Sequence, residues 1–188
     1  FMAACNFGHK NIVILLLNRS DRFELNARDN YGKTAFMAAC LHGHRDVVKL
    51  LLKNSDIELN ARNDEGSTAF MYACFHGHKD VVQLILNSYK RIELNARDDF
   101  GKTAFMWACS NGYKDVVQLL LDHYARIVLN ARSNDGETAF MIACELGHKD
   151  VVKLILEYSE VVDIPESFQL GHPCTMCQKS YFCPKIEF

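Results

Sequence analysis

The chain has 188 residues, of which 49% are hydrophobic, and this composition excludes an intrinsically disordered protein. The net charge of −2 excludes an overall basic field of the kind that attracts nucleic acid. The longest uninterrupted apolar run has seven residues, 69–75, well short of the roughly 20 that a membrane-spanning helix needs.

One short stretch recurs through the chain. Residues 32–40 read G-K-T-A-F-M-A-A-C, and close copies begin at Gly66, Gly101 and Gly136. The glycines that open these copies are 34, 35 and 35 residues apart, and a fifth, incomplete copy occupies residues 1–5. Self-similarity at such a period indicates a repeat array, in which each unit packs against its neighbours. Because the chain opens inside a copy, we expect further repeats before it.

Each repeat carries signals for two short helices, and the unit that begins at residue 29 shows them in order. Residues 29–32, D-N-Y-G, predict a turn whose glycine adopts a positive φ. Thr34 is a good N-cap for a helix over residues 35–41, and Gly43 supplies the left-handed residue that ends it. A second helix is predicted over residues 46–53.

The second helix reads D-V-V-K-L-L-L-K and carries an apolar stripe. Val47, Leu50 and Leu51 fall at i, i+3 and i+4, which predicts that they form its buried side. Lys49 and Lys53 are expected to face water.

The order of turn, helix, tight turn, antiparallel helix and loop, together with the residues that fill it, resembles the ankyrin repeat. The resemblance implies an all-α solenoid of about five stacked helix-turn-helix repeats with protruding β-turns. It covers residues 1–164, which we expect to form the array, and leaves residues 165–188 as a non-repeat tail. The residues of one unit that match the family pattern are Gly32, Thr34, Phe36, Ala39, Gly43, His44, Val47, Val48, Leu50, Leu51, Leu52, Asn60 and Ala61.

Two positions depart from the T-P-L-H motif of the family. Alanine stands in place of the proline, and methionine stands in place of the histidine, at Met37, Met71, Met106 and Met141. In the family that histidine forms a hydrogen bond near the turn, whereas a thioether is expected only to pack. We therefore expect a local loss of rigidity without a change of fold.

Five of the eight cysteines hold one equivalent position in successive repeats: Cys5, Cys40, Cys74, Cys109 and Cys144. Equivalent atoms in stacked helices lie about 8–10 Å apart, whereas a disulfide needs Cα atoms within about 7 Å. These cysteines are therefore expected to be small buried hydrophobic residues in a reducing compartment. That expectation places the chain inside the cell, in the cytoplasm or the nucleus.

No catalytic motif stands out. The chain contains no Gly-rich phosphate loop, no nucleophile elbow and no H-E-x-x-H. The His42–Asp46 and Asp122–His123 neighbours fit surface polar residues better than catalytic pairs, because a general base needs a positioned partner and a pocket. We therefore expect no enzyme, no cofactor and no metal in the array.

The tail allows one alternative. It contains four potential zinc ligands in the pattern H-x-C-x-x-C-x5-C: His172, Cys174, Cys177 and Cys183. Zinc would order a segment that is too short to build its own core, but two well-separated ligand pairs are absent. A structural spacer with a zinc-binding tail stays open beside a tail of reduced thiols.

A second alternative concerns the asparagines that recur in L-N-A-R: Asn26, Asn60, Asn95 and Asn130. Asparagine is suited to bond the backbone on both sides of a turn, which is a structural role. The resemblance also implies that such asparagines are hydroxylated by an oxygen-dependent hydroxylase, which would make the chain a substrate.

The resemblance implies that a partner binds the concave face formed by the protruding turns and the first helices. Residues on this face vary between repeats while the core positions recur. Its expected apolar anchors, unless they pack sideways on a neighbouring turn, are Tyr31, Leu41, Phe75 and Phe100. The full candidate set is Tyr31, Lys33, Leu41, His42, Arg62, Glu65, Phe75, His76, Arg97, Phe100, Lys102 and Asn111.

One arginine per repeat forms a column: Arg28, Arg62, Arg97 and Arg132. The column is either a ladder for an acidic or extended peptide, or a set of solvated side chains paired with Asp29, Asp64, Asp98 or Asp99. The acidic turn tips argue against nucleic acid. We expect a monomer that binds an unidentified protein or peptide and has no nucleic-acid or membrane partner.

Overall fold

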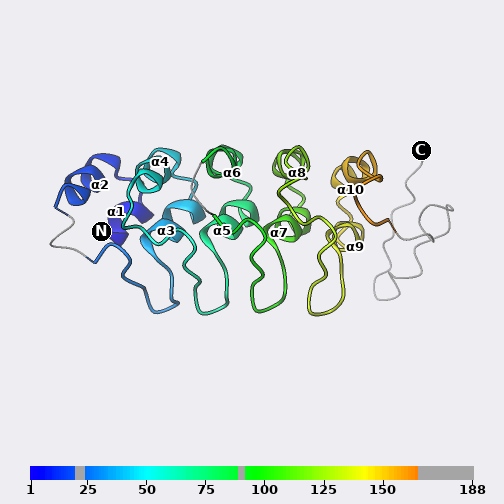
Figure 1. The fold of residues 1–188 in the computed structure, drawn as a ribbon, viewed down its shortest axis with the longest axis horizontal. Coiled ribbons are helices and arrows are strands. Elements are labelled where there is room, and N and C mark those ends of the chain that lie inside the picture. Colours follow the sequence, from blue (N-terminus) through cyan, green and yellow to red (C-terminus); the bar gives the residue numbers. More distant parts are fainter. Residues whose placement is uncertain (20–23, 89–91, 165–188) are drawn as a thin grey trace.

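The structure, a computed structural model, describes residues 1–19, 24–88 and 92–164. In these ranges the chain forms ten helices and no strand, which confirms the all-α architecture. The helices form five antiparallel pairs that stack side by side in two rows, the first helices in one row and the second helices in the other (Figure 1). The first helices are α1 (Met2–Asn6), α3 (Ala35–Leu41), α5 (Ala69–Phe75), α7 (Ala104–Ser110) and α9 (Ala139–Glu145). The second helices are α2 (Lys10–Leu17), α4 (Arg45–Lys53), α6 (Lys79–Leu86), α8 (Lys114–Leu121) and α10 (Lys149–Leu156).

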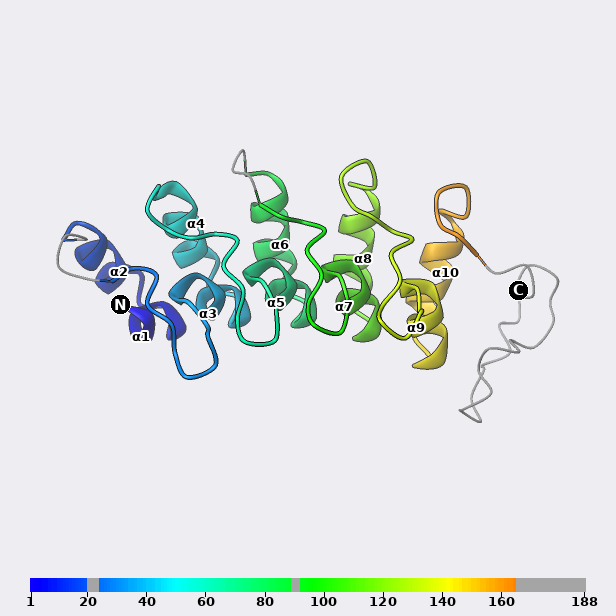
Figure 2. The same ribbon diagram turned by 60° about the horizontal axis from the view of Figure 1, so that its bottom comes forward.

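Long loops project beyond the row of first helices, and a turn closes the end of each (Figures 1 and 2). In the first of these turns the backbone N–H of Asp29 donates to the carbonyl of Lys33 at 3.0 Å, and the other three repeat this bond. Gly32 has φ 73°, as the turn signal predicts. We call residues 29–33, 63–67, 98–102 and 133–137 the tip turns.

A threonine begins each first helix from α3 onward. The hydroxyl of Thr34 accepts the backbone N–H of Met37 at 3.4 Å, and Thr68, Thr103 and Thr138 act in the same way. These bonds satisfy an amide that the helix itself leaves without a partner, as predicted for Thr34.

The prediction that the repeated methionine only packs is wrong in two repeats. The sulfur of Met71 accepts the backbone N–H of Thr68 at 3.4 Å, and the sulfur of Met141 accepts that of Thr138 at 3.5 Å. Threonine and methionine thus form a reciprocal capping box in which a weak thioether acceptor takes the usual place of Glu or Gln.

The turn between the two helices of a pair brings neighbouring repeats into close contact. Gly43 has φ 70°, and a Cβ built on it would lie 2.5 Å from Nδ1 of His78 in the next repeat. Glycine is therefore needed both for the left-handed backbone and for the space it leaves. α4 then begins at Arg45, one residue before the predicted start, because His44 serves as its N-cap.

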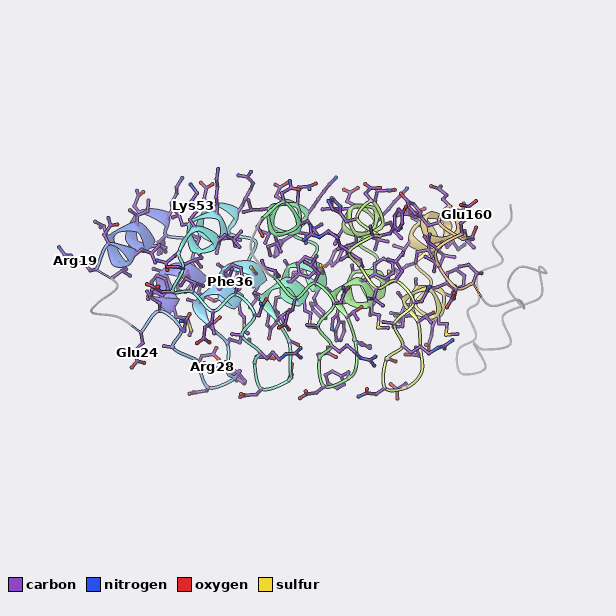
Figure 3. All side chains as sticks on the ribbon, in the orientation of Figure 1. Arg19, Glu24, Arg28, Phe36, Lys53 and Glu160 are labelled. Atoms are coloured by element: carbon purple, nitrogen blue, oxygen red, sulfur yellow. The ribbon has the colours of Figure 1, made fainter. Side chains whose placement is uncertain are left out.

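One continuous apolar core runs between the two rows of helices. Its largest repeated members are phenylalanines at most 2% exposed, Phe36, Phe70, Phe105 and Phe140, of which Phe36 is labelled in Figure 3. In α4 the buried stripe consists of Val47, Val48, Leu51 and Leu52. Leu50 packs against this core but is only half-buried, so it lies at the edge of the stripe. α4 packs both against the row of first helices and against its neighbours in the row of second helices, so its buried stripe is broad.

The five repeated cysteines are buried thiols, as predicted. Burial raises the pKa of Cys5 to about 12. It raises the pKa of Cys40, Cys74 and Cys109 well above the ordinary thiol range. These side chains are therefore uncharged members of the core.

Three kinds of side chain join each repeat to the backbone of its neighbour. The first is the histidine before a second helix, which is present in three of these contacts and replaced by Tyr113 before α8. His44, His78 and His148 lie 2.8–2.9 Å through Nε2 from the carbonyls of Asn6, Leu41 and Ser110. The second is the asparagine of L-N-A-R. Asn95 donates to the carbonyl of Arg126 at 2.9 Å and accepts the N–H of Val128 at 2.8 Å, and Asn26 and Asn130 bridge the next loop in the same manner.

The third link is the arginine column, whose guanidinium groups bond to the backbone of the neighbouring loop rather than to aspartate. The guanidinium of Arg28 donates to the carbonyl of Arg62, that of Arg62 to the carbonyl of Arg97 at 2.6 Å, and that of Arg97 to the carbonyl of Arg132 at 2.5 Å. The predicted pairing with aspartate is therefore wrong. Figure 3 labels Arg28 among the projecting loops, where these bonds tie one loop to the next.

Candidate functional site

The tip turns and the exposed sides of the first helices face the same region, and they carry most of the predicted anchors. Tyr31 and Phe100, on two tip turns, are 68% and 54% exposed. Leu41 and Phe75, at the ends of α3 and α5, are half-buried. Both side chains are therefore only partly open to a partner, and sideways packing was one of the two predicted alternatives.

Phe75 packs against the next repeat through an aromatic contact. Its ring lies 5.1 Å from the ring of Trp107 in an edge-to-face arrangement at 68°, and 4.8 Å from the ring of His76. Such contacts contribute about 0.5–1.5 kcal/mol beyond the burial of area. A pocket of about 140 Å³ opens beside them, lined by Glu65, Ser67, Met71, Tyr72, Phe75, Phe100 and Trp107.

Two of these lining residues, Tyr72 and Trp107, were missed by reasoning from the sequence. They occupy the variable position of T-A-F-M-x-A-C, which holds Ala38, Tyr72, Trp107 and Ile142 in successive repeats. That variation inside an otherwise constant motif is the signal that would have found them, because a position that differs between repeats is where one repeat makes a contact that the others lack.

Buried polar side chains hold the two rings in place. Trp107 donates through Nε1 to Oδ2 of Asp98 at 2.7 Å, and the hydroxyl of Tyr72 accepts from Nδ2 of Asn63 at 3.0 Å. Asp98 also accepts the N–H of Lys102 at 2.8 Å, so one carboxylate fixes both the tip turn and the indole. The rings are thus positioned before any partner arrives.

Two lysines lie over the aromatic rings. The Nζ of Lys33 is 5.3 Å from the ring centre of Tyr31 and 5.7 Å from that of Tyr72. The Nζ of Lys102 is 4.5 Å from the ring centre of Trp107. These are cation–π distances. Neither lysine is among the ion pairs of residues 1–19, 24–88 and 92–164, which join Lys10 and Arg45 to Asp46, Arg62 to Glu93, and Lys79 to Asp115.

Comparison with family models decides what kind of array this is. The family described as "Ankyrin repeats (3 copies)" matches residues 1–63, 55–131 and 90–166. The chain belongs to the ankyrin-repeat family. A comparison with curated proteins finds no match. Ankyrin repeats are generally protein–protein interaction modules, and the family is typically non-catalytic.

Three other candidate residues lie at the rim of this ankyrin surface. Burial, the neighbouring histidines and Lys33 lower the pKa of His42 and of His76, so both rings are mainly neutral at pH 7. Asn111 donates to the carbonyl of Trp107 at 2.9 Å and closes the end of α7. His76 and Asn111 therefore offer uncharged hydrogen-bonding groups beside the pocket, and His42 offers one in the preceding repeat.

Arg62 and Arg97, also predicted to bind a partner, are not brought to this pocket. They line a separate shallow hollow of about 770 Å³ together with Ile92, Glu93, Leu94, Asn95, Ala96 and Arg126. Their guanidinium groups are held by the arginine links between ankyrin repeats. The arrangement indicates a role in joining the loops.

The side chains that the sequence suggested for metal or acid–base chemistry have other partners where the structure describes them. No group of three or more His, Cys, Asp and Glu side chains in this part of the chain is placed to hold a metal ion. Asp46 pairs with Lys10 at 3.0 Å, and Nδ1 of His123 lies 2.8 Å from the carbonyl of Leu119. The four predicted zinc ligands of the tail lie outside the described residues. No helix in residues 1–19, 24–88 and 92–164 has the length and apolar character needed to cross a bilayer.

Proposed function

We propose that this ankyrin array binds a partner protein or peptide, without catalysis, through the face made by its tip turns and first helices. The observation that carries the proposal is the aromatic pocket between α5 and α7, whose walls are fixed by hydrogen bonds to Asp98 and Asn63. Rigid aromatic side chains in a water-excluding pocket are the usual centres of binding energy in protein interfaces. Fixing them in advance lowers the entropy cost of association.

The same surface favours a protein over nucleic acid. The tip turns carry Asp64, Glu65, Asp99 and Asp135, which interrupt any basic stripe along the array.

We also propose that the chain acts as a monomer inside the cell, with the array ending at residue 164 and a separate tail following it. Hydroxylation of the L-N-A-R asparagines stays a prediction, which the mass of the intact protein from cells would test.

The test is affinity capture from cell lysate with the full chain beside a Phe75→Ala/Phe100→Ala variant. We expect the variant to lose a captured protein while its helicity by circular dichroism is unchanged. The matched control is Tyr124→Ala, because Tyr124 is 53% exposed and lies in the loop after α8. Equal capture by all three proteins would place the interface elsewhere and contradict the proposal.

A further inference from the structure

The size and lining of the aromatic pocket define what it is able to hold. Its volume of about 140 Å³ lies well below the roughly 300–1,000 Å³ of pockets that enclose a small molecule or cofactor. Four aromatic rings and the thioether of Met71 supply most of its wall. A pocket of this size and character fits a single large apolar side chain of a partner.

The charged residues beside the pocket indicate which groups of the partner would flank the side chain that fills it. Lys33 and Lys102 are both half-buried, and in the described chain neither lies within ion-pairing distance of a carboxylate. Their amino groups rest on the rings of Tyr72 and Trp107. A carboxylate that reached either amino group would gain an ion pair without breaking one, because no existing pair holds these lysines.

The spacing of these two lysines limits the shape of the partner. Lys33 and Lys102 belong to tip turns two repeats apart, but Lys33 leans toward Tyr72 of the next repeat, so their amino groups are separated by one to two repeats, roughly 10–20 Å. An extended peptide covers that distance in about three to six residues. Glu65 is the one anionic side chain that lines the pocket, and its charge keeps partner carboxylates to the two sides.

We infer that the partner presents an extended acidic segment in which one large apolar side chain fills the pocket. A carboxylate on each side of that side chain pairs with Lys33 and with Lys102. This inference rests on the proposed function and names the chemistry of the partner.

The experiment selects peptides from a random twelve-residue phage library on the full chain. The expected peptides carry one large apolar residue with Asp or Glu within three positions on both sides. Trp107 is the single tryptophan of the chain, so a tryptophan-free synthetic version of the most enriched peptide is then titrated by intrinsic fluorescence. Its binding should change the Trp107 emission, because the indole lines the pocket.

Charge-removing variants then test the flanking carboxylates. A Lys33→Met/Lys102→Met double variant should bind this peptide about tenfold more weakly, the combined effect of two exposed ion pairs. Lys79→Met is the matched control, because Lys79 is an exposed lysine at the start of a second helix and pairs with Asp115 at 3.9 Å. It should leave the affinity unchanged.

The remaining outcomes separate this inference from the proposed function. Two outcomes would overturn the inference alone. In one, the peptides depend on Phe75 and Phe100 but carry no acidic residues; in the other, they bind the double lysine variant as tightly as the native chain. Peptides that bind without any dependence on Phe75 and Phe100, or a selection that enriches nothing, would overturn both.

Discussion

The central repeat, α5–α6, contacts one repeat on each side. The two contacts are built in the same way except at one residue, which is a histidine in the first and a tyrosine in the second. We call the contact of the α3–α4 pair with the α5–α6 pair the histidine seam, because Nε2 of His78 lies 2.8 Å from the carbonyl of Leu41. In the next contact, between the α5–α6 and α7–α8 pairs, Tyr113 replaces the histidine and makes no side-chain hydrogen bond within the described residues. This second contact is the tyrosine seam.

The tyrosine seam replaces the lost polar link with aromatic surface. Its Phe75 carries no histidine bond on its carbonyl, and its ring packs on Trp107 at the wall of the pocket. Both seams keep an arginine link and a bond between neighbouring tip turns, from the N–H of Asp64 to the carbonyl of Tyr31 at 3.2 Å and from that of Asp99 to Glu65 at 3.0 Å. Because a solenoid is stabilised by nearest-neighbour contacts, one seam is free to change without altering the other.

The largest loss of stability is expected from substitutions in the core, and it should be the same at the two seams. Phe70→Ala and Phe105→Ala each remove a ring that is 1% exposed, and each should lower the free energy of unfolding by about 3–5 kcal/mol. Urea unfolding followed by circular dichroism measures both. A difference of more than about 1 kcal/mol between them would show that the seams also differ inside the core.

An intermediate effect is expected from exchanging the residues that distinguish the seams. His78→Tyr should destabilise the histidine seam by about 1 kcal/mol, and Tyr113→His should stabilise the tyrosine seam by a similar amount through a new bond to the carbonyl of Phe75. Amide hydrogen exchange in α5, α6 and α7 reports the two changes locally. If both substitutions shift protection in the same direction, the histidine link is not what separates the seams.

The smallest change in stability is expected from a substitution in the last tip turn, which lies outside both seams. Burial and the neighbouring Glu145 carboxyl raise the pKa of Glu137 above its ordinary value of 4.5. A carboxyl whose pKa is higher in the folded protein favours folding while it is protonated, and this contribution is lost as the pH rises through the folded value. Glu137→Gln should therefore raise stability at pH 7 by up to about 0.5 kcal/mol.

The pH dependence distinguishes this explanation from a general effect of removing charge. The gain from Glu137→Gln should shrink as the pH falls toward 4.5, when the native carboxyl itself becomes protonated. Glu58→Gln, in the loop after α4, serves as the control. The difference in melting temperature between this variant and the native protein is expected to stay nearly constant across the same pH range. A gain at Glu137 that is independent of pH would contradict the raised pKa.

The fold was predictable from the sequence because the repeat marks the residues that every unit needs. Thr34 as a cap, Gly32 and Gly43 at positive φ, and the buried cysteines all followed from recurrence and local chemistry. The ends of the helices followed to within one residue.

The candidate site was less predictable, for two physical reasons. Tyr72 and Trp107 do not stand out in the sequence because they occupy one variable position inside an otherwise constant helix, and the pocket is built from that position. The partner of Arg28 depends on which backbone atoms the stacking brings within reach, and no spacing along one repeat encodes that distance. The bond of Met71 is local, but a thioether is not the Glu or Gln that marks a capping box in a sequence.

The asparagine, arginine and histidine links have one property in common: each ends on a main-chain atom of the adjacent repeat. Main-chain atoms are present whatever the side chain, so these three links require no matched side chain in the neighbouring repeat. A unit of this chain is therefore able to be duplicated, deleted or exchanged by recombination without a compensating mutation next to it. The array is built to gain and lose binding surface one repeat at a time over evolution.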